Sequence, residues 1–200
     1  MKLLFATRNP GKLRELRDLV GSRFDVQSLA DHPNLPEIDE KGETFEENAR
    51  LKALACARST GIATLADDSG LCVDALKGRP GVRSARYALG TDAARIEKLL
   101  GEMREVADEN RGAAFRCALC LALPEGWSVT ESGECRGRIA RRAQGSNGFG
   151  YDPVFFIPEL GRTMAELTPE EKARISHRAQ AWARMRPHFA LLYFSADACR

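Results

Sequence analysis

The segment "IATLADDSG" (Ile62–Gly70) places two adjacent carboxylates, Asp67 and Asp68, directly after an apolar run. The run Ile62–Ala66 predicts a buried strand, with the two acids at its tip. Adjacent like charges repel one another and are costly to bury, so a cation is expected to compensate them. A divalent metal ion is one candidate for that cation. A solvated turn that binds nothing is the alternative.

Helices and strands alternate outward from this segment, and the strands then cluster in the middle of the chain. The expected strands are at Lys2–Ala6, Ala113–Leu123, around Ser128–Glu134 and, more briefly, at 154–158, with a strand or edge at 135–142. The expected helices are one with Leu13, Leu16, Leu19 and Val20 on one side, one from Thr44 to Gly61, one at Asp92–Met103 and one from Thr168 through Met185. Pro187 should kink or break the last of these helices. This order predicts an α/β fold with a mixed β-sheet and flanking helices. No repeat or linker divides the chain, so a single domain over residues 1–200 is expected.

The composition is that of an ordinary globular protein, with 44% hydrophobic and 29% charged residues. A net charge of +2 gives no indication of a tail that binds nucleic acid. The apolar run at the N-terminus is too short for a signal peptide, and no stretch approaches the ~18 apolar residues of a membrane span. We therefore expect a cytoplasmic protein that contacts no membrane.

Six cysteines raise the question of a metal site. Cys117 and Cys120 have the CxxC spacing of zinc ligands, but no second CxxC or HxxxH follows them. Both lie inside the apolar run 113–123, where cysteine behaves as a small hydrophobic residue. Packing in the core is the favoured interpretation over zinc.

The segment "FATRNPGK" (Phe5–Lys12) combines a strand end, a tight polar turn and the start of a helix. Free N–H groups at a helix N-terminus, with Lys12 beside them, could bind an anion, and Thr7 and Asn9 offer further donors. The segment is not a Walker A loop, because Ala6 occupies the position of its first glycine. The alternative is a plain turn capped by Asn9, with Pro10 as the first helical residue.

The acidic loop that precedes the second helix makes a metal-binding role for Asp67 and Asp68 more plausible. That loop supplies Glu37, Asp39, Glu40 and Glu43, and the helix itself carries Lys52. A few carboxylates with phosphates completing the coordination shell are the usual ligands of Mg²⁺. A carboxylate near such a metal could also orient and deprotonate a water molecule. The alternative is a solvated acidic loop and an unrelated strand end.

Two later segments could contact a ligand. In "SNGFGYDP" (146–153) two glycines surround Phe149, an aromatic ring that could stack on a base or anchor in the core. In "ISHRAQAW" (175–182) a continuous helix would direct His177 about 200° away from Ile175, off the apolar stripe. His177 and Arg178 would then be available to a ligand or to solvent. Arginine only donates hydrogen bonds, so it could favour a carbonyl over an amino group on a base edge.

Together these segments resemble the Ham1/RdgB family, the inosine/xanthosine triphosphate pyrophosphatases. The matching pieces run in the family's order from residue 6 to 178: "ATRNPGK", "GETFEENARLKA", "ADDSGL", "GRPGVRSARYA", "GFGYDPVF" and "TPEEKARISHR". Any one of them is a weak motif, but the ordered set is highly specific.

The resemblance implies an elongated mixed sheet with two lobes around a central nucleotide cleft, and a homodimer. It implies Mg²⁺-dependent hydrolysis of ITP, dITP and XTP to the nucleoside monophosphate and pyrophosphate, with no nucleic-acid partner. Transferred to this sequence, the catalytic residues would be Asp68, as proton acceptor for water, with Lys12 and Lys52. The metal ligands would be Glu40 and Asp68, although Asp39 or Asp67 could replace Glu40. The substrate-binding residues would be Thr7, Arg8, Asn9, Pro10, Gly11, Lys12, Ser69, Phe149, Gly150, Tyr151, Asp152, Lys172, His177 and Arg178.

Two positions depart from the family's pattern, because Arg8 stands where a small residue is common and Asn147 replaces a common glycine. A Maf-like pyrophosphatase is the nearest alternative, but its serine-proline-arginine-rich opening is absent. An RNA-binding module and an inactive relative are further alternatives. A concentrated basic patch would favour the first, whereas intact Lys12, Asp68 and Arg178 argue against the second.

Overall fold

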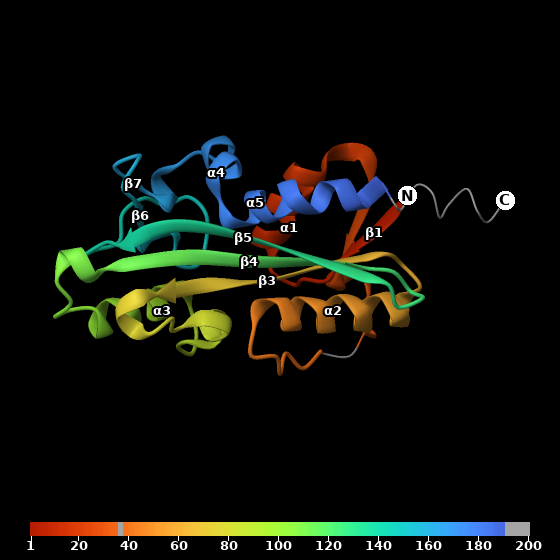
Figure 1. Cartoon of the computed structure of the whole chain (residues 1–200), viewed down its shortest axis with the longest axis horizontal. Coiled ribbons are helices and arrows are strands. Elements are labelled where there is room, and N and C mark those ends of the chain that lie inside the picture. The colour runs from red at the N-terminus through yellow and green to blue at the C-terminus, as the bar shows by residue number, and fades with distance from the viewer. Residues whose placement is uncertain (36–37, 191–200) are drawn as a thin grey trace. The chain divides into compact units, whose positions relative to one another are not determined.

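The computed structural model describes residues 1–35 and 38–190 of the chain. Its seven-stranded sheet has the strand order β2-β1-β3-β4-β5-β6-β7 (Figure 1). β1 pairs in parallel with β2 and β3, whereas β6 pairs antiparallel with β5 and β7. The strands are β1 (Lys2–Phe5), β2 (Asp25–Ser28), β3 (Thr64–Val73), β4 (Gly112–Ala122), β5 (Ser128–Ile139), β6 (Phe155–Ile157) and β7 (Arg162–Thr163). The α-helices are α1 (Pro10–Val20), α2 (Phe45–Thr60), α3 (Asp92–Glu102), α4 (Pro169–Ile175) and α5 (His177–Met185). The predicted mixed sheet with flanking helices is confirmed.

The helix starts follow the sequence signals closely. The Asn9 side chain caps α1 by accepting from the amides of residues 11 and 12, and Pro10 is the first helical residue. Thr44 and Glu47 form a capping box at the start of α2, and that helix ends at Gly61 with a φ of 68°. These positions were predictable for two reasons. The first amides of a helix have no partner within the helix and are bonded by a few polar side chains, and glycine is favoured where the residue after a helix is left-handed.

Two expectations were wrong. β3 extends to Val73, so Asp67 and Asp68 lie in the middle of a ten-residue strand and not at its tip. The helix predicted from Thr168 through Met185 is broken at Ser176, whose ψ of 153° is extended, and α4 and α5 are therefore separate. The face calculated for His177 from a continuous helix consequently does not apply. The break expected near Pro187 is confirmed, since α5 ends at Met185.

The chain forms two compact units. The first unit comprises Met1–Asp68, Cys117–Gly133 and the described residues from Arg178 on, and the second comprises Ser69–Arg116 and Glu134–His177. The chain passes from one unit to the other within β3, β4 and β5 and between residues 177 and 178. The single domain over residues 1–200 stays a prediction.

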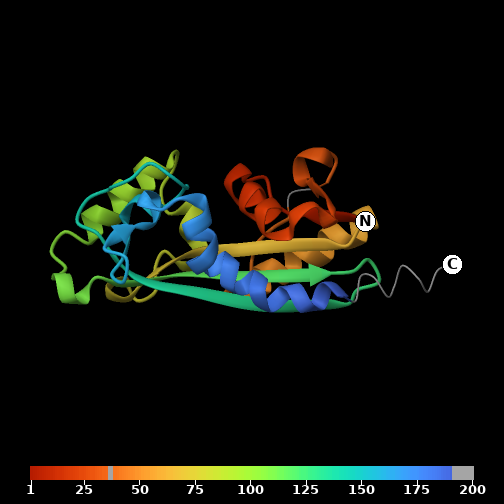
Figure 2. The same ribbon diagram turned by 90° about the horizontal axis from the view of Figure 1, so that it is seen from above.

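In the first unit, helices cover both faces of the strands. Helices α1 and α5 lie on one face, and α2 lies on the opposite face (Figures 1 and 2). The core beneath α1 and α5 includes Leu16 and Trp182 packed with Leu65 of β3. On α2, by contrast, the buried residues include the small Ala49 and Ala53. Alternation along β3 therefore directs successive side chains toward different helices.

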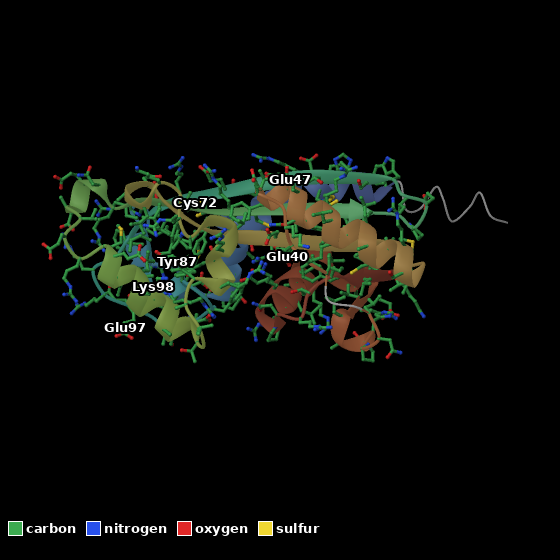
Figure 3. The ribbon with its side chains drawn as sticks, turned by 90° about the horizontal axis from the view of Figure 1, so that it is seen from below. Glu40, Glu47, Cys72, Tyr87, Glu97 and Lys98 are labelled. Atoms are coloured by element: carbon green, nitrogen blue, oxygen red, sulfur yellow. The ribbon has the colours of Figure 1, made fainter. Side chains whose placement is uncertain are left out.

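The second unit has its own core around α3. Leu99 of α3 and Met103, the residue directly after that helix, belong to one cluster with Leu71 and Phe155. Beside this cluster, the Lys98 ammonium lies 4.4 Å from the centre of the Tyr87 ring and donates to the Tyr87 carbonyl at 2.8 Å; Figure 3 labels both side chains. The helix and the turn before it are thus attached to each other. Among the described residues, no helix combines the length and the apolar character that a membrane crossing requires.

Candidate active site

Asp67 and Asp68 point to opposite faces of β3, because successive side chains of a strand alternate. Both are buried, with exposed fractions of 1% and 6%. Their surroundings differ: Asp67 meets α1 and α5, and Asp68 meets α2. The two carboxylates therefore do not share one environment, and each needs its own explanation.

Asp67 is bound by two cations and a thiol. Its Oδ1 pairs with the Lys12 ammonium, and its Oδ2 accepts from Arg178 Nε at 2.8 Å and from Cys117 Sγ at 3.1 Å. Burial alone would raise the pKa of Asp67, but the charges of Arg178 and Lys12 outweigh it and hold that pKa well below its usual range. The cation that compensates Asp67 is therefore supplied by the protein itself.

Arg178 is almost completely buried, with 1% of its surface exposed. Its guanidinium bonds Asp67 through Nε and pairs with Glu15 of α1 through one terminal nitrogen. The expectation that Arg178 lies on a solvent-accessible helix face is wrong, because α5 begins anew at His177 after the break at Ser176. A buried arginine with two carboxylates is charged and fixed in orientation.

Asp68 lies beside the polar face of α2 formed by Asn48 and Lys52, which are one helical turn apart. Burial raises the pKa of Asp68 to about 6, and the negative charge of Glu40 adds to this, whereas Lys52 and Lys12 oppose it. Lys52 pairs with Glu40 Oε1 at 2.7 Å and donates to the Asp67 carbonyl at 3.0 Å. The pKa values of the two neighbouring carboxyls are therefore shifted in opposite directions.

These carboxylates fit a hard divalent cation. Glu40, labelled in Figure 3, comes from the loop before α2, and its negative charge contributes to the raised pKa of Asp68. Carboxylate oxygens are the hard ligands that Mg²⁺ prefers. Asp39 instead pairs with Lys41 at 2.8 Å on the surface, and Asp67 is committed to Lys12 and Arg178. Within the described residues, no group of three or more acidic, histidine or cysteine side chains forms a complete metal site. Two carboxylates would leave coordination positions for phosphate oxygens. The predicted acid Glu37 lies outside the described residues.

At the start of α1, the predicted anion-binding segment is present as a capped turn. Asn9 Oδ1 accepts from Gly11 N at 2.8 Å and Lys12 N at 3.1 Å, and Asn9 N donates to Thr7 Oγ1 at 3.1 Å. The capping interpretation is therefore confirmed. Arg8, Asn9 and Pro10 are exposed, so a ligand that binds to the first unit could contact them.

In the second unit, the loop 148–152 is tightly organised around Asp152. Asp152 Oδ2 accepts from Phe149 N at 2.9 Å and from Lys172 Nζ at 2.5 Å. The Lys172 ammonium also lies 4.8 Å from the centre of the Phe149 ring. Gly148 has a φ of 77°, and a Cβ there would lie 2.0 Å from Asp152 Oδ2. Phe149 is half-buried and belongs to neither hydrophobic core, so the interpretation of this ring as a core anchor is wrong.

The remaining predicted residues of the second unit are Gly150 and Tyr151 in this loop, and His177 and Ser69 elsewhere in the chain. Gly150 has a φ of 64°, and the Tyr151 hydroxyl donates to the Ser84 carbonyl at 3.0 Å. His177 is 5% exposed and stacks on Phe115 with ring centres 4.9 Å apart, so it too is not on a solvated face. Ser69 is half-buried and directly follows Asp68 in the chain.

Several residues that shape these sites had no distinctive sequence signal. Glu15 is three residues after Lys12 on α1, but nothing in the sequence indicates its partner in α5. Asn48 could have been found from its spacing, because a residue four positions before Lys52 shares its helix face. Cys117 was assigned to the core, which is confirmed by its 1% exposure, but its bond to Asp67 was not foreseen.

Comparison with known proteins gives consistent matches over nearly the whole chain. The model of the Ham1 family matches residues 3–188. A dITP/XTP pyrophosphatase of Geobacter sulfurreducens is 51% identical over 190 residues, covering 94% of this chain and 96% of that protein, and the Geobacillus kaustophilus protein of the same name is 51% identical over 92% of each chain. Among solved structures, a HAM1 protein from Coxiella burnetii has a TM-score of 0.85 and 40% identity, covering 95% of this chain and 98% of that chain. A Mycobacterium abscessus structure titled nucleoside-triphosphatase and dITP/XTP pyrophosphatase has a TM-score of 0.76 and 49% identity, covering 94% of this chain and all of that chain.

Proposed function

This chain belongs to the Ham1 family, and on that premise we propose that it hydrolyses noncanonical purine nucleoside triphosphates. The substrates are ITP, dITP and XTP, and the products are the nucleoside monophosphate and pyrophosphate. The names of the relatives support the substrate class, since they are dITP/XTP pyrophosphatases at about half identity over most of the chain. The names also favour a purine nucleotide over the pyrimidine or modified base of a Maf-like enzyme.

Asp68 is the observation on which the proposed chemistry rests. A general base is most effective when its pKa lies near the working pH, and burial raises the pKa of Asp68 to about 6. In the metal-free protein the carboxylate is then mostly ionised at neutral pH, and it would accept the proton of the attacking water. Asp67, whose pKa is held well below its usual range, is too weak a base for that role.

Lys12 and Lys52 are proposed to bind the triphosphate. Their side chains are 17% and 11% exposed, so each ammonium is partly buried yet has some accessible surface. The segment of Thr7, Arg8, Asn9, Pro10, Gly11 and Lys12 would supply further donors to the phosphates. Fixed cations lower the energy of the charge that develops when pyrophosphate leaves.

Glu40 and Asp68 would hold the metal, proposed to be Mg²⁺. The bound ion would neutralise phosphate charge and orient the triphosphate for attack by water. Lys52 pairs with Glu40 in the protein alone and so keeps that carboxylate in place before substrate and metal bind. Asp39 is a poorer candidate because its ion pair with Lys41 is exposed on the surface.

The base is proposed to stack on Phe149, with Gly150, Tyr151, Asp152 and Ser69 lining the site. Lys172, His177 and Arg178 would read the purine, chiefly its 6-keto group. Because Arg178 is buried and pairs with Asp67 and Glu15, its contact with the base would require those bonds to rearrange when the nucleotide binds. Donors suit inosine and xanthine, which present an acceptor where adenine presents an amino group. Guanine shares the 6-keto group, so this contact does not account for discrimination against GTP.

The resemblance also leads us to propose a homodimer in the cytoplasm, with no nucleic-acid or membrane partner. Light scattering coupled to size-exclusion chromatography would measure the mass, and a value near 44 kDa, about twice the 22.0 kDa of one chain, is expected. A mass of one chain at micromolar concentration would contradict the dimer.

The test is pyrophosphate release from ITP, XTP, GTP and ATP with Mg²⁺, for the wild type, Asp68→Asn and Asp39→Asn. We expect rapid release from ITP and XTP, weak release from GTP and ATP, loss in Asp68→Asn, and normal rates in the surface variant Asp39→Asn. Equal rates on all four nucleotides would overturn the proposed base reading. No release from any of them would overturn the proposed function.

A further inference from the structure

The backbone of the loop that carries Phe149 is hydrogen-bonded to a carboxylate from outside its own turn, in addition to the contacts of Asp152 and Tyr151 described above. Within the turn, Phe149 N donates to Asp152 Oδ2, and Asp152 N donates to Phe149 O at 3.3 Å. The next amide, Gly150 N, donates instead to Asp92 Oδ2 at 2.7 Å. Asp92 is 58 residues away in the sequence, at the start of α3. The backbone directly after the ring is therefore fixed by a carboxylate from another element.

The orientation of the Asp92 carboxylate is itself fixed. Its Oδ1 pairs with the Arg95 guanidinium one turn along α3. Arg95, whose side chain is 18% exposed, donates in addition to the carbonyls of Ala85 and Gly90, each at 3.2 Å. The guanidinium thus joins the start of α3 to the preceding turn, and it holds one carboxylate oxygen while the other faces Gly150.

Asp92 is not required to cap its own helix. The cap of α3 is Thr91, whose hydroxyl accepts from Ala94 N at 3.3 Å. The usual reason for an acid in the first turn of a helix is its interaction with the helix dipole, which is a small effect at an exposed position. With the cap supplied by Thr91, the bond to Gly150 is a separate feature of Asp92.

We propose that Asp92 is a positioning residue for base binding, which acts by fixing the Gly150 amide so that the neighbouring Phe149 ring is held ready to stack on the base. This inference rests on the stacking role of Phe149 in the proposed function. A charge-assisted hydrogen bond is stronger than a neutral one, and Gly150 has a positive φ that the loop must keep. A preordered ring loses less conformational freedom when the nucleotide binds.

The experiment measures KM and kcat for ITP with Phe149→Ala, Asp92→Ala, Asp92→Asn and the double variant of Phe149→Ala and Asp92→Ala. Thr91→Ala is the matched control, because it removes the cap of the same helix and leaves the contact to Gly150. Inhibition by inorganic triphosphate is measured in each variant, since that ligand has no base.

We expect Asp92→Ala to raise KM for ITP about tenfold with little change in kcat or in the inhibition constant for triphosphate. Asp92→Asn keeps one acceptor oxygen and should recover part of the loss. The double variant should bind ITP no more weakly than Phe149→Ala alone, because the two residues act through one ring.

Four results would contradict the proposal, each in a different way. If Phe149→Ala leaves KM for ITP unchanged, the proposed stacking is wrong. If Phe149→Ala raises KM but Asp92→Ala does not, the positioning role of Asp92 is overturned. If Thr91→Ala raises KM as much as Asp92→Ala, or if the effects of Asp92→Ala and Phe149→Ala multiply, Asp92 acts only through the stability of α3.

Discussion

Removing the charge of Asp68 should stabilise the metal-free protein at neutral pH, although the same change should abolish its activity. In the structure, burial and the charge of Glu40 outweigh the attraction of Lys52 and Lys12, and the pKa of Asp68 is raised from 3.8 to about 6. The native state therefore holds this proton more tightly than the unfolded chain does. Stability from this group is fully present below pH 3.8 and is lost as the pH rises through about 6.

The size of the effect follows from the two pKa values. A difference of about two pH units corresponds to ~3 kcal/mol of unfolding free energy at pH 7.5. At pH 4.5 most native molecules keep the proton, and the same relation leaves a penalty of only ~1 kcal/mol. The amide introduced by Asp68→Asn carries no charge at either pH, so this variant should be more stable than the wild type, and the gap should shrink by ~2 kcal/mol between pH 7.5 and pH 4.5.

The assay is urea unfolding in EDTA at both pH values, for the wild type, Asp68→Asn and the surface control Asp39→Asn. Addition of millimolar Mg²⁺ at pH 7.5 should stabilise the wild type and Asp39→Asn but not Asp68→Asn, because the bound cation neutralises the buried charge of the Asp68 carboxylate. A variant Asp68→Asn that is less stable than the wild type at pH 7.5, or a gap that does not change with pH, would refute this reasoning.

Three further predictions concern the surroundings of this carboxylate and the loop of the second unit. Asp67→Asn should change the stability in the opposite direction and destabilise the protein by ~3–5 kcal/mol in urea unfolding, because it removes the carboxylate shared by the buried Arg178 and the partly buried Lys12. Phe149→Ala should raise KM for ITP by about tenfold or more through lost stacking, measured as pyrophosphate release. Gly148→Ala should lower the melting temperature and raise KM for ITP, since its Cβ would lie 2.0 Å from Asp152 Oδ2 and its φ is 77°.

Local signals in the sequence predicted much of the fold. Caps at Asn9, Thr44 and Thr168 were recognisable because a helix start needs a side-chain acceptor within three residues. The long strand β4 followed from its apolar run. The end of β3 did not follow, because "DDSG" contains residues that are depleted in strands, and the cations that compensate Asp67 come from residues distant in the sequence.

The candidate site was less predictable because its partners are distant in sequence. Asp67 and Arg178 are 111 residues apart, and no periodicity links them. The exposed face expected for Arg178 depended on a continuous helix, and the break at Ser176 removed its basis. If the strand had been predicted to extend through both residues, the alternation of side chains along β3 would have placed Asp67 and Asp68 on opposite faces of the sheet. The catalytic and substrate-binding roles of these side chains stay predictions.

The most direct test of the central claim is phosphorus NMR of the products that the purified protein forms from ITP with Mg²⁺. The account predicts IMP and pyrophosphate in equal amounts, with no IDP or inorganic phosphate, and no turnover by Asp68→Asn. Release of inorganic phosphate with IDP would contradict it, because the bond cleaved would then lie between the β- and γ-phosphates.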